Sequence, residues 1–142
     1  MKSRPEWHYK QSAVIPYRKK DGKLEILLIT SQNKGNWIIP KGIIDENLSP
    51  EESAKKEAKE EAGVVGKVGS DLIGQYTYKK WGGTCSVKVY ALQVKETLDN
   101  WSEGDIRLRK WLPVNKAIKT VKKKSLAKIL NEFRENFDSY SV

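Results

Sequence analysis

One stretch, residues 42–64, constrains the fold of this chain more than any other. It reads GIIDENLSPEESAKKEAKEEAGV and carries the start and stop signals of a helix. Ser49 is suited to cap the helix, Pro50 suits its first position, and Glu52 completes an S-x-x-E capping box. Gly63 is the expected end. We therefore predict a helix that begins at Pro50 and is closed by Gly63.

Three acidic residues of this helix, Glu57, Glu60 and Glu61, stand at spacings of three and four, so we expect their carboxylates to converge on one face. Like charges at these spacings cost about 0.2–0.5 kcal/mol per pair. Solvent and the neighbouring lysines of a surface helix can offset that cost. A hard divalent cation can also offset it, because Mg²⁺ and Mn²⁺ prefer carboxylate oxygens. The glutamates alone leave both explanations open and favour the first.

The same stretch resembles the signature of the Nudix hydrolase family, G-x5-E-x7-R-E-U-x-E-E-x-G-U, in which U is aliphatic. The matching positions are Gly42, Glu57, Ala58, Glu60, Glu61, Gly63 and Val64. Two positions depart: Leu48 replaces a glutamate, and Lys56 replaces an arginine and loses its bidentate fork. The resemblance implies an active enzyme that binds Mg²⁺, or Mn²⁺, through Glu57, Glu60, Glu61 and the backbone carbonyl of Gly42.

The rest of the chain reads as strands and a helical tail. Residues 10–18 and 24–30 form an expected hairpin around Asp21 and Gly22, and Pro16 predicts a bulge or an edge position. Further expected elements are a short strand leading from Trp37 to Gly42, paired strands at 72–80 and 84–94, a strand at 106–112, and a helical tail from Val114. Ala54, Ala58 and Ala62 predict close packing of the central helix on the sheet. This order suits the α/β/α sandwich with a mixed β-sheet that the resemblance implies.

Composition narrows the class of protein. A chain of 142 residues is expected to form one domain, residues 1–142, and its single cysteine, Cys85, excludes a disulfide framework. The chain lacks an apolar run of signal-peptide or membrane-spanning length, so we expect no membrane partner and a cytoplasmic location. The net charge of +9 fits solubility, attraction to nucleic acid, or a polyphosphorylated substrate. Composition does not choose among these three.

Short motifs outside the signature are WIIPKG at 37–42, EEAGVVGKVG at 60–69, WSE at 101–103 and RLRKW at 107–111. Their layout is similar to that of the diphosphoinositol polyphosphate phosphohydrolases, a group that also cleaves diadenosine polyphosphates. The Lys41–Gly42 pair is similar to the diadenosine tetraphosphate hydrolases of the same family. Basic residues that the resemblance implies for phosphate binding are Lys10, Lys41, Arg107, Arg109 and one lysine of 122–124, for which we take Lys124. Arg107 and Arg109 alternate, so we expect both on one face of a strand. Tyr76, Tyr78 and Tyr90 are interpreted as sheet packing. Trp37 is interpreted as packing rather than as a base-stacking platform, although a place at the rim of the cleft would allow both.

The predicted reaction is Mg²⁺-dependent hydrolysis of a phosphoanhydride bond in a small polyphosphorylated molecule, of the diadenosine polyphosphate or inositol pyrophosphate type. Glu60 or Glu61 is the expected general base, with Glu103 as the alternative. A catalytically weak sensor of nucleotides is the first competing hypothesis, supported by Leu48 alone. A nucleic-acid protein, including an enzyme acting on RNA 5′ ends, is the second. It is less favoured because no stripe of aromatics interleaved with Lys and Arg is present.

Overall fold

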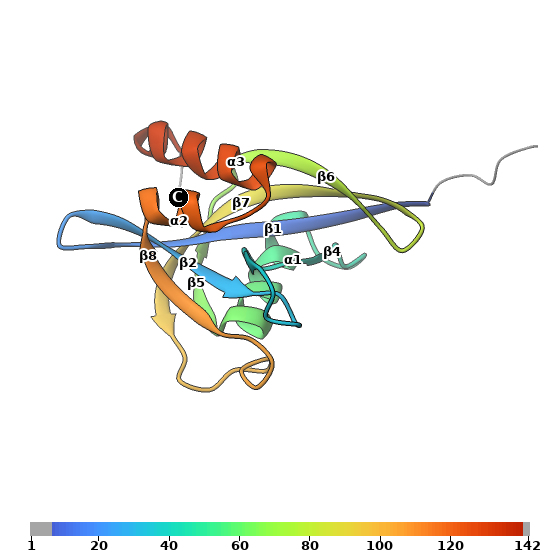
Figure 1. Ribbon diagram of the computed structural model, residues 1–142, viewed down its shortest axis with the longest axis horizontal. Helices are drawn as coiled ribbons and strands as arrows, with labels where there is room; N and C mark the ends of the chain where they lie inside the picture. Colours follow the sequence, from blue (N-terminus) through green and yellow to red (C-terminus); the bar gives the residue numbers. More distant parts are fainter. Residues whose placement is uncertain (1–6, 141–142) are drawn as a thin grey trace, which may run out of the picture.

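The computed structural model describes residues 7–140 of the chain. A mixed β-sheet forms its centre, with helices on both faces (Figure 1). The strands are β1 (Trp7–Lys20), β2 (Lys23–Thr30), β3 (Trp37–Ile38), β4 (Lys41–Ile43), β5 (Val64–Val68), β6 (Gly74–Lys80), β7 (Gly83–Thr97) and β8 (Arg109–Pro113). The helices are α1 (Pro50–Glu57), the π-helix η1 (Ala58–Ala62), α2 (Val114–Thr120), α3 (Lys124–Glu135) and the 3₁₀-helix η2 (Phe137–Ser139).

The sheet has the order β3-β2-β1-β7-β5, with β4 also paired to β1, β6 to β7 and β8 to β2. Strands β1 and β7 run parallel, and the other strand pairs of residues 7–140 are antiparallel. Alternate residues of β1 enter two separate cores: Ile15 packs with Phe133 of α3, and Val14 packs with Ala58 of η1. The predicted α/β/α sandwich with a mixed sheet is therefore confirmed.

The tight turn predicted between β1 and β2 is confirmed. Asp21 and Gly22 have φ angles of 53° and 77°, as a type I′ turn requires at both central positions. Strand β1 lies in the middle of the sheet, but Pro16 is paired on the β7 side alone, which agrees with the expected edge position at this residue. Pro16 is tolerated there because β1 changes partner at this point: its register with β4 ends at Ala13, and its register with β2 begins at Tyr17.

The central helix begins and ends as predicted. The Ser49 hydroxyl accepts a hydrogen bond from the backbone N–H of Glu52 at 3.1 Å, and Gly63 ends the helix in the left-handed conformation at φ 67°. The three alanines of the inner face are fully buried against the sheet. The π-helical geometry of η1 was not predicted, and it changes the direction of the side chains in the second half of the helix.

The tail differs from the prediction because it forms two helices, α2 and α3, separated by an extended residue, Val121. The predicted apolar stripe is present in α3, where Leu126, Ile129, Leu130 and Phe133 are buried. Strand β5 was not predicted, since VVGKV is short and gives a weak alternating signal. Among the helices of residues 7–140, none is long and apolar enough to cross a membrane.

Candidate active site

A groove of about 630 Å³ lies beside the central helix. Strands β1 and β4, the loop after β2, the helix and the tip of the β6–β7 hairpin contribute to its walls. The residues that carry its chemistry are Lys41, Gly42, Glu57, Glu61, Tyr78 and Arg107. Five of these six were predicted as metal or phosphate ligands from the resemblance, and four of the five lie together as one group: Lys41, Gly42, Glu57 and Glu61. Arg107, also predicted, joins them from the segment before β8.

Glu61 is the most buried carboxylate of the groove, with 8% of its surface exposed. Its Oε1 accepts a hydrogen bond from the backbone N–H of Lys41 at 3.1 Å, and its Oε2 lies 3.6 Å from Nη2 of Arg107. Burial raises the pKa of Glu61 to about 8, although Arg107 and the Lys41 N–H act in the opposite direction. The side chain thus lies in an environment that does not fully compensate its negative charge.

Glu57 lies beside Glu61 in the same groove. Burial raises the pKa of Glu57, and the nearby Glu60 carboxylate adds to the increase. Two adjacent carboxylates whose pKa values are both raised attract positive charge to the groove. Gly42 lets them approach its strand: a Cβ at this position would lie 2.7 Å from Cγ of Glu57, so a larger residue would displace the Glu57 side chain.

Glu60 does not join this pair. Glu60 is absent from the groove walls, and no three acidic, His or Cys side chains within residues 7–140 are grouped to hold a metal. The Glu60 carboxylate is nevertheless near enough to Glu57 to raise the pKa of that group, so a metal-binding role for Glu60 stays a prediction. The π-helical turn has more residues per turn than an α-helix, so it rotates Glu60 farther from the groove side of Glu57 than an α-helix would. The backbone carbonyl of Glu60 accepts a hydrogen bond from the N–H of Glu103 at 3.0 Å.

Arg107 is held rigidly at the end of the groove, with 6% of its surface exposed. Its Nε donates to Oε1 of Glu103 at 2.8 Å, and its Nη1 donates to the carbonyl of Thr30 at 2.9 Å. The third nitrogen faces Glu61. Arg107 precedes β8, so it does not share a strand face with Arg109 as predicted. Arg107 lines the groove, and its contact with substrate stays a prediction.

Arg109 lies elsewhere. Its guanidinium stacks on the ring of Trp101 at 3.9 Å, and it donates to the carbonyls of Ala62, at 3.0 Å, and of Leu98. Trp101 in turn donates its indole N–H to the carbonyl of Glu61 at 3.0 Å. Arg109 is not among the residues that line the groove. Together Arg109 and Trp101 satisfy carbonyls at the end of the central helix, a contact that sequence reasoning missed because its partners are far apart in the chain.

The predicted lysines divide in the same way. Lys41 lines the groove, and burial lowers the pKa of its ammonium group. Lys10 is exposed on β1 and does not line the groove, whereas its neighbour Gln11 does, because successive side chains of a strand point to opposite faces. Lys124 begins α3 and is exposed; Lys122 and Lys123, which the prediction also considered, line an adjoining pocket.

This adjoining pocket, of about 490 Å³, opens into the groove past Tyr78 and Lys41 and is called the aromatic chamber here. Its walls include Trp37, Tyr76, Tyr78, Lys122, Lys123 and Leu126. The Lys123 ammonium lies 4.6 Å from the ring centroid of Tyr78, and the Tyr78 hydroxyl donates to Oε1 of Gln11 at 2.7 Å. We expected Tyr78 only to pack on the sheet. It also lines both the chamber and the groove. Trp37 packs on the core, as expected, and also lines the chamber, so both packing and base stacking stay open to it.

The two departures from the family signature lie outside the groove. Leu48 and Lys56 line a separate hollow on the outer side of the helix, and Nζ of Lys56 lies 3.8 Å from Oδ2 of Asp45. Neither residue is among the groove residues. The missing glutamate at position 48 thus leaves the Glu57 and Glu61 pair intact.

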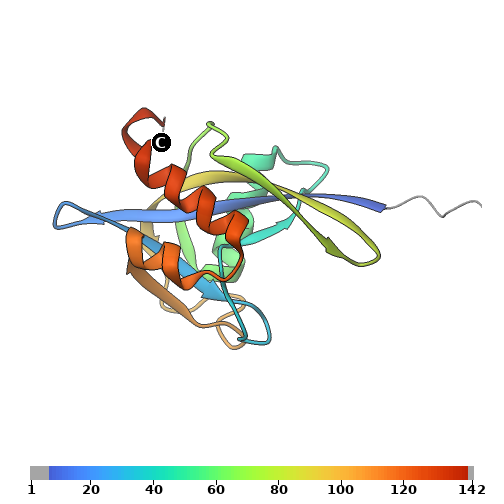
Figure 2. The same ribbon diagram turned by 45° about the horizontal axis from the view of Figure 1, so that its top comes forward.

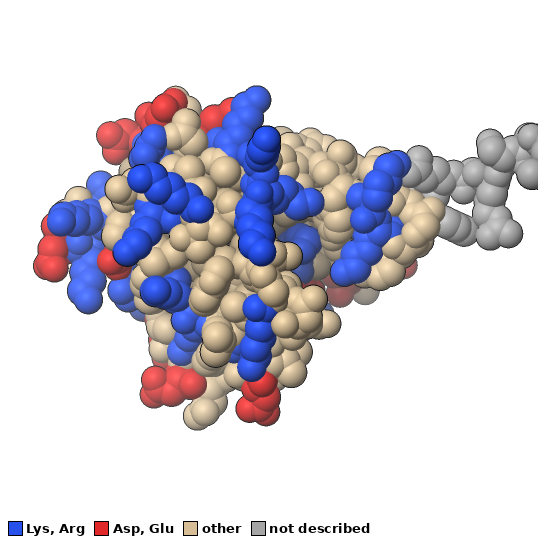
Figure 3. Space-filling view, viewed as in Figure 1, with Lys and Arg blue, Asp and Glu red and all other residues tan. Residues whose placement is uncertain are grey.

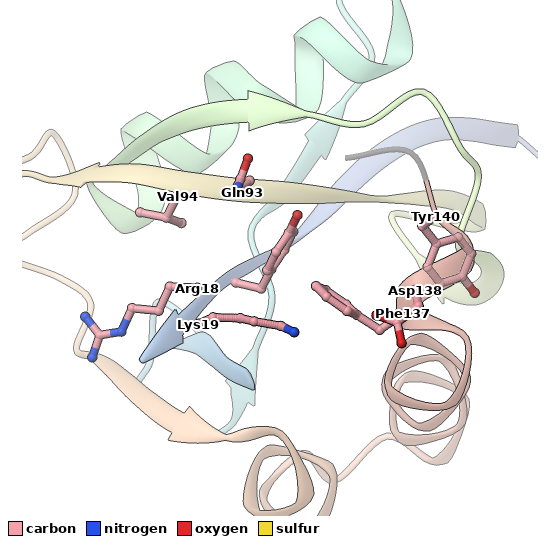
Figure 4. Close-up of a pocket in the computed structure, with 8 residues that line it drawn as sticks. Arg18, Lys19, Gln93, Val94, Phe137, Asp138 and Tyr140 are labelled. Carbon is pink, nitrogen blue, oxygen red and sulfur yellow. The ribbon is translucent and has the colours of Figure 1, made fainter. Parts of the chain in front are cut away.

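Another pocket, of about 500 Å³, lies near the opposite end of β1 (Figure 4). Lys19 points toward Phe137, with its ammonium 5.0 Å from the ring centroid, and Arg18 points away toward Glu25, which it contacts at 2.8 Å. Asp138 is the single carboxylate among its lining residues. A pocket without paired carboxylates is a poor metal site, so the groove remains the candidate active site.

Comparison with known proteins identifies the family of this chain. Residues 8–136 match the family model described as NUDIX domain, and the chain belongs to the Nudix family. It is 34% identical over 123 residues to Nudix hydrolase 13, mitochondrial, of Arabidopsis thaliana, covering 80% of this chain and 61% of that protein. It is 32% identical over 119 residues to diphosphoinositol polyphosphate phosphohydrolase 3-beta of Bos taurus, covering 82% of this chain and 71% of that protein.

Among solved structures, the chain is similar to a C. elegans Ap4A hydrolase, with a TM-score of 0.76 and 25% identity. That match covers 92% of this chain and 99% of the other. The resemblance drawn from the sequence is therefore confirmed at the level of the family and of its relatives.

Proposed function

We propose that this chain hydrolyses a phosphoanhydride bond in a nucleoside polyphosphate, with a divalent cation in the groove. The observation that carries the proposal is the pair Glu57 and Glu61, which lie together in a groove walled by the cations Lys41, Lys80 and Arg107. Carboxylates alone would repel a polyphosphate. A phosphate site built from cations alone would not explain the two carboxylates. A groove with both fits a metal ion that bridges protein and phosphate.

The residues present fit Mg²⁺. This ion usually keeps several waters and is held by one or two carboxylates and by substrate phosphates, so the pair Glu57 and Glu61 is a sufficient donor set. Gly42 would contribute its backbone carbonyl, as the resemblance implies. When bound, the cation neutralises phosphate charge and lowers the pKa of the attacking water. Mn²⁺ suits the same oxygen ligands.

The chain's own residues supply the remaining requirements. Lys41, Lys80 and Arg107 offset the charge of the bound polyphosphate, and Arg107 is already fixed by Glu103 and Thr30, so it loses little freedom when substrate binds. Of the glutamates considered as general base, Glu61 lines the groove and Glu60 and Glu103 do not. We therefore place proton abstraction at the Glu61 oxygen that would be left free of the cation, while Glu57 and the other Glu61 oxygen would hold the cation.

The substrate class follows from the aromatic chamber. Its tyrosine and tryptophan rings and the Lys123 ammonium suit a flat, π-rich base beside a polyphosphate better than they suit a polyol. A diadenosine polyphosphate is therefore favoured over an inositol pyrophosphate. Figure 3 shows Lys and Arg spread widely over the face that carries α2 and α3, which also suits a polyanionic ligand.

The test measures phosphate release from diadenosine tetraphosphate, an inositol pyrophosphate, nucleoside diphosphate sugars and triphosphorylated RNA, with Mg²⁺, Mn²⁺ or EDTA. Metal-dependent turnover of diadenosine tetraphosphate, lost in Glu57→Gln and Glu61→Gln and kept in the exposed control Glu46→Gln, is the expected result. If triphosphorylated RNA were the single substrate hydrolysed, RNA would replace dinucleoside polyphosphates as the substrate class. Tight binding without turnover would make the chain a sensor.

We further propose that residues 1–142 act as one domain and that the protein is cytoplasmic. The groove draws residues from β1 near the start of the chain and from Arg107 near its end, which supports a single unit. Several relatives carry the word mitochondrial in their names, so imaging of the tagged protein in cells is the measurement that decides its location.

A further inference from the structure

The tip of the β6–β7 hairpin carries an unexpected residue for its backbone conformation. Trp81 and Gly82 have φ angles of 56° and 69°, the type I′ arrangement that the β1–β2 hairpin achieves with Asp21 and Gly22. Asp and Asn adopt positive φ readily, whereas a bulky residue there is an outlier. Strained positions of this kind are concentrated at binding and catalytic sites. Trp81 is therefore a candidate functional residue, and turn geometry alone does not explain it.

The indole of Trp81 is held in place at the groove although 51% of the residue is exposed. The ring of Tyr9 meets it edge to face at a centroid distance of 5.2 Å, and the Tyr9 hydroxyl donates to the Trp81 carbonyl at 3.3 Å. The ammonium of Lys80 lies 4.8 Å from the indole centroid. Figure 2 shows the hairpin reaching outward alongside the beginning of β1, so this ring forms the outer end of the site.

Strand β6 connects this tip with the aromatic chamber. Tyr76, Tyr78 and Lys80 alternate along β6 and so share one face of it. At ~3.4 Å per residue, Tyr76 and Lys80 are about 14 Å apart. Tyr76 lines the chamber, Tyr78 lines both chamber and groove, and Lys80 and Trp81 line the groove. The site is thus an elongated channel with aromatic rings at both ends and cations and carboxylates between them.

We propose that Trp81 is a stacking platform for the second base of a dinucleoside polyphosphate whose first base occupies the aromatic chamber. Lys80 faces the phosphates next to that second base. This inference rests on the proposed function and deepens it, because it predicts a substrate with a planar group at each end of its phosphate chain. A ligand with one base fills the chamber and the central groove and does not reach Trp81.

The experiment compares two ligands with four phosphates, diadenosine tetraphosphate and adenosine 5′-tetraphosphate. For Trp81→Ala we expect kcat/KM for the two-base ligand to fall roughly 5- to 20-fold, in the lower part of the range for stacking one base on an aromatic ring. For the one-base ligand we expect less than about a twofold change, since it lacks the group that would stack. Trp81→Phe should retain most of the effect of the ring. Leu72→Ala is the matched control, because Leu72 is also exposed, at 48%, and lies outside the groove.

Equal losses for both ligands, or no loss for either, would overturn the inference. Dissociation constants measured by calorimetry, both with Mg²⁺ and with EDTA, separate it from the proposed function. If wild-type protein hydrolyses neither ligand, the proposed function fails, yet Trp81→Ala must still weaken binding of the two-base ligand selectively. Failure of the wild-type protein to bind the two-base ligand at all would overturn both.

Discussion

Arg109 provides the sharpest test of how the site is built, because sequence and structure suggest different roles for it. If Arg109 binds phosphate, its removal would weaken substrate binding. In the structure its guanidinium bonds the carbonyls of Ala62 and Leu98 and stacks on Trp101, so its loss should destabilise the fold. Hydrogen bonds from a charged group contribute about 1.5–3 kcal/mol each. Two such bonds at a partly exposed site suggest that Arg109→Ala lowers the free energy of unfolding by about 3 kcal/mol.

Thermal and urea unfolding measure this loss. For a chain of this length, about 3 kcal/mol corresponds to a fall in Tm of roughly 6–12 °C. Arg109→Lys keeps the charge but lacks the planar fork, so its loss should be intermediate. Lys110→Ala, an exposed neighbour on β8, is the control and should unfold like the wild type. An Arg109→Ala protein with wild-type stability and a tenfold higher KM would refute the structural role and restore the phosphate-ligand hypothesis.

Three further predictions concern the groove. Glu61→Gln should keep the fold, seen by circular dichroism, and lower kcat by orders of magnitude, because it removes the proposed base; wild-type activity would contradict that role. In EDTA the pKa of Glu61 is about 8 in the folded protein, so the folded protein keeps a proton on Glu61. The unfolded chain releases this proton near the ordinary pKa of a glutamate. Stability of the metal-free protein should therefore fall as pH rises from about 5 to 8, and less so in Glu61→Gln; parallel pH curves would count against this. Gly42→Ala should displace Glu57 and weaken Mn²⁺ binding measured by calorimetry, and an unchanged affinity would mean that the Cβ is accommodated.

Features that depend on neighbouring residues were predicted well from the sequence. The Ser49 cap, the Gly63 stop and the Asp21–Gly22 turn each use contacts within a few residues, and each is present. The inner alanines and the stripe of α3 follow from helical periodicity. The groove residues Glu57, Glu61 and Gly42 lie together because one helix and the strand before it carry all three.

Features that depend on distant residues were missed or misplaced. Arg107 and Arg109 look alike in the sequence, and their different roles come from Glu61, Thr30 and Trp101, which only the folded chain brings near them. The π-helical turn that rotates Glu60 away from the groove side of Glu57 has no local sequence signal that we recognised. The alternating pattern of its strand predicted only that Tyr78 packs on the sheet. Its place between groove and chamber depends on the loop after β2 and on the segment before α3, which are distant in the chain.

The parallel pairing of β1 with β7 has a consequence for synthesis of the protein. Trp7 pairs with Gly83 and Tyr17 with Gln93, so each residue of the longest ladder waits for a partner 76 positions later in the chain. At ~5–20 residues per second, that interval lasts roughly 4–15 s on the ribosome. During it the β1–β2 hairpin can form, but the other edge of β1 has open hydrogen-bonding groups and apolar side chains such as Ile15. The nascent chain is therefore most exposed to misassociation before β7 emerges, and a chaperone that shields strand edges would act in that interval.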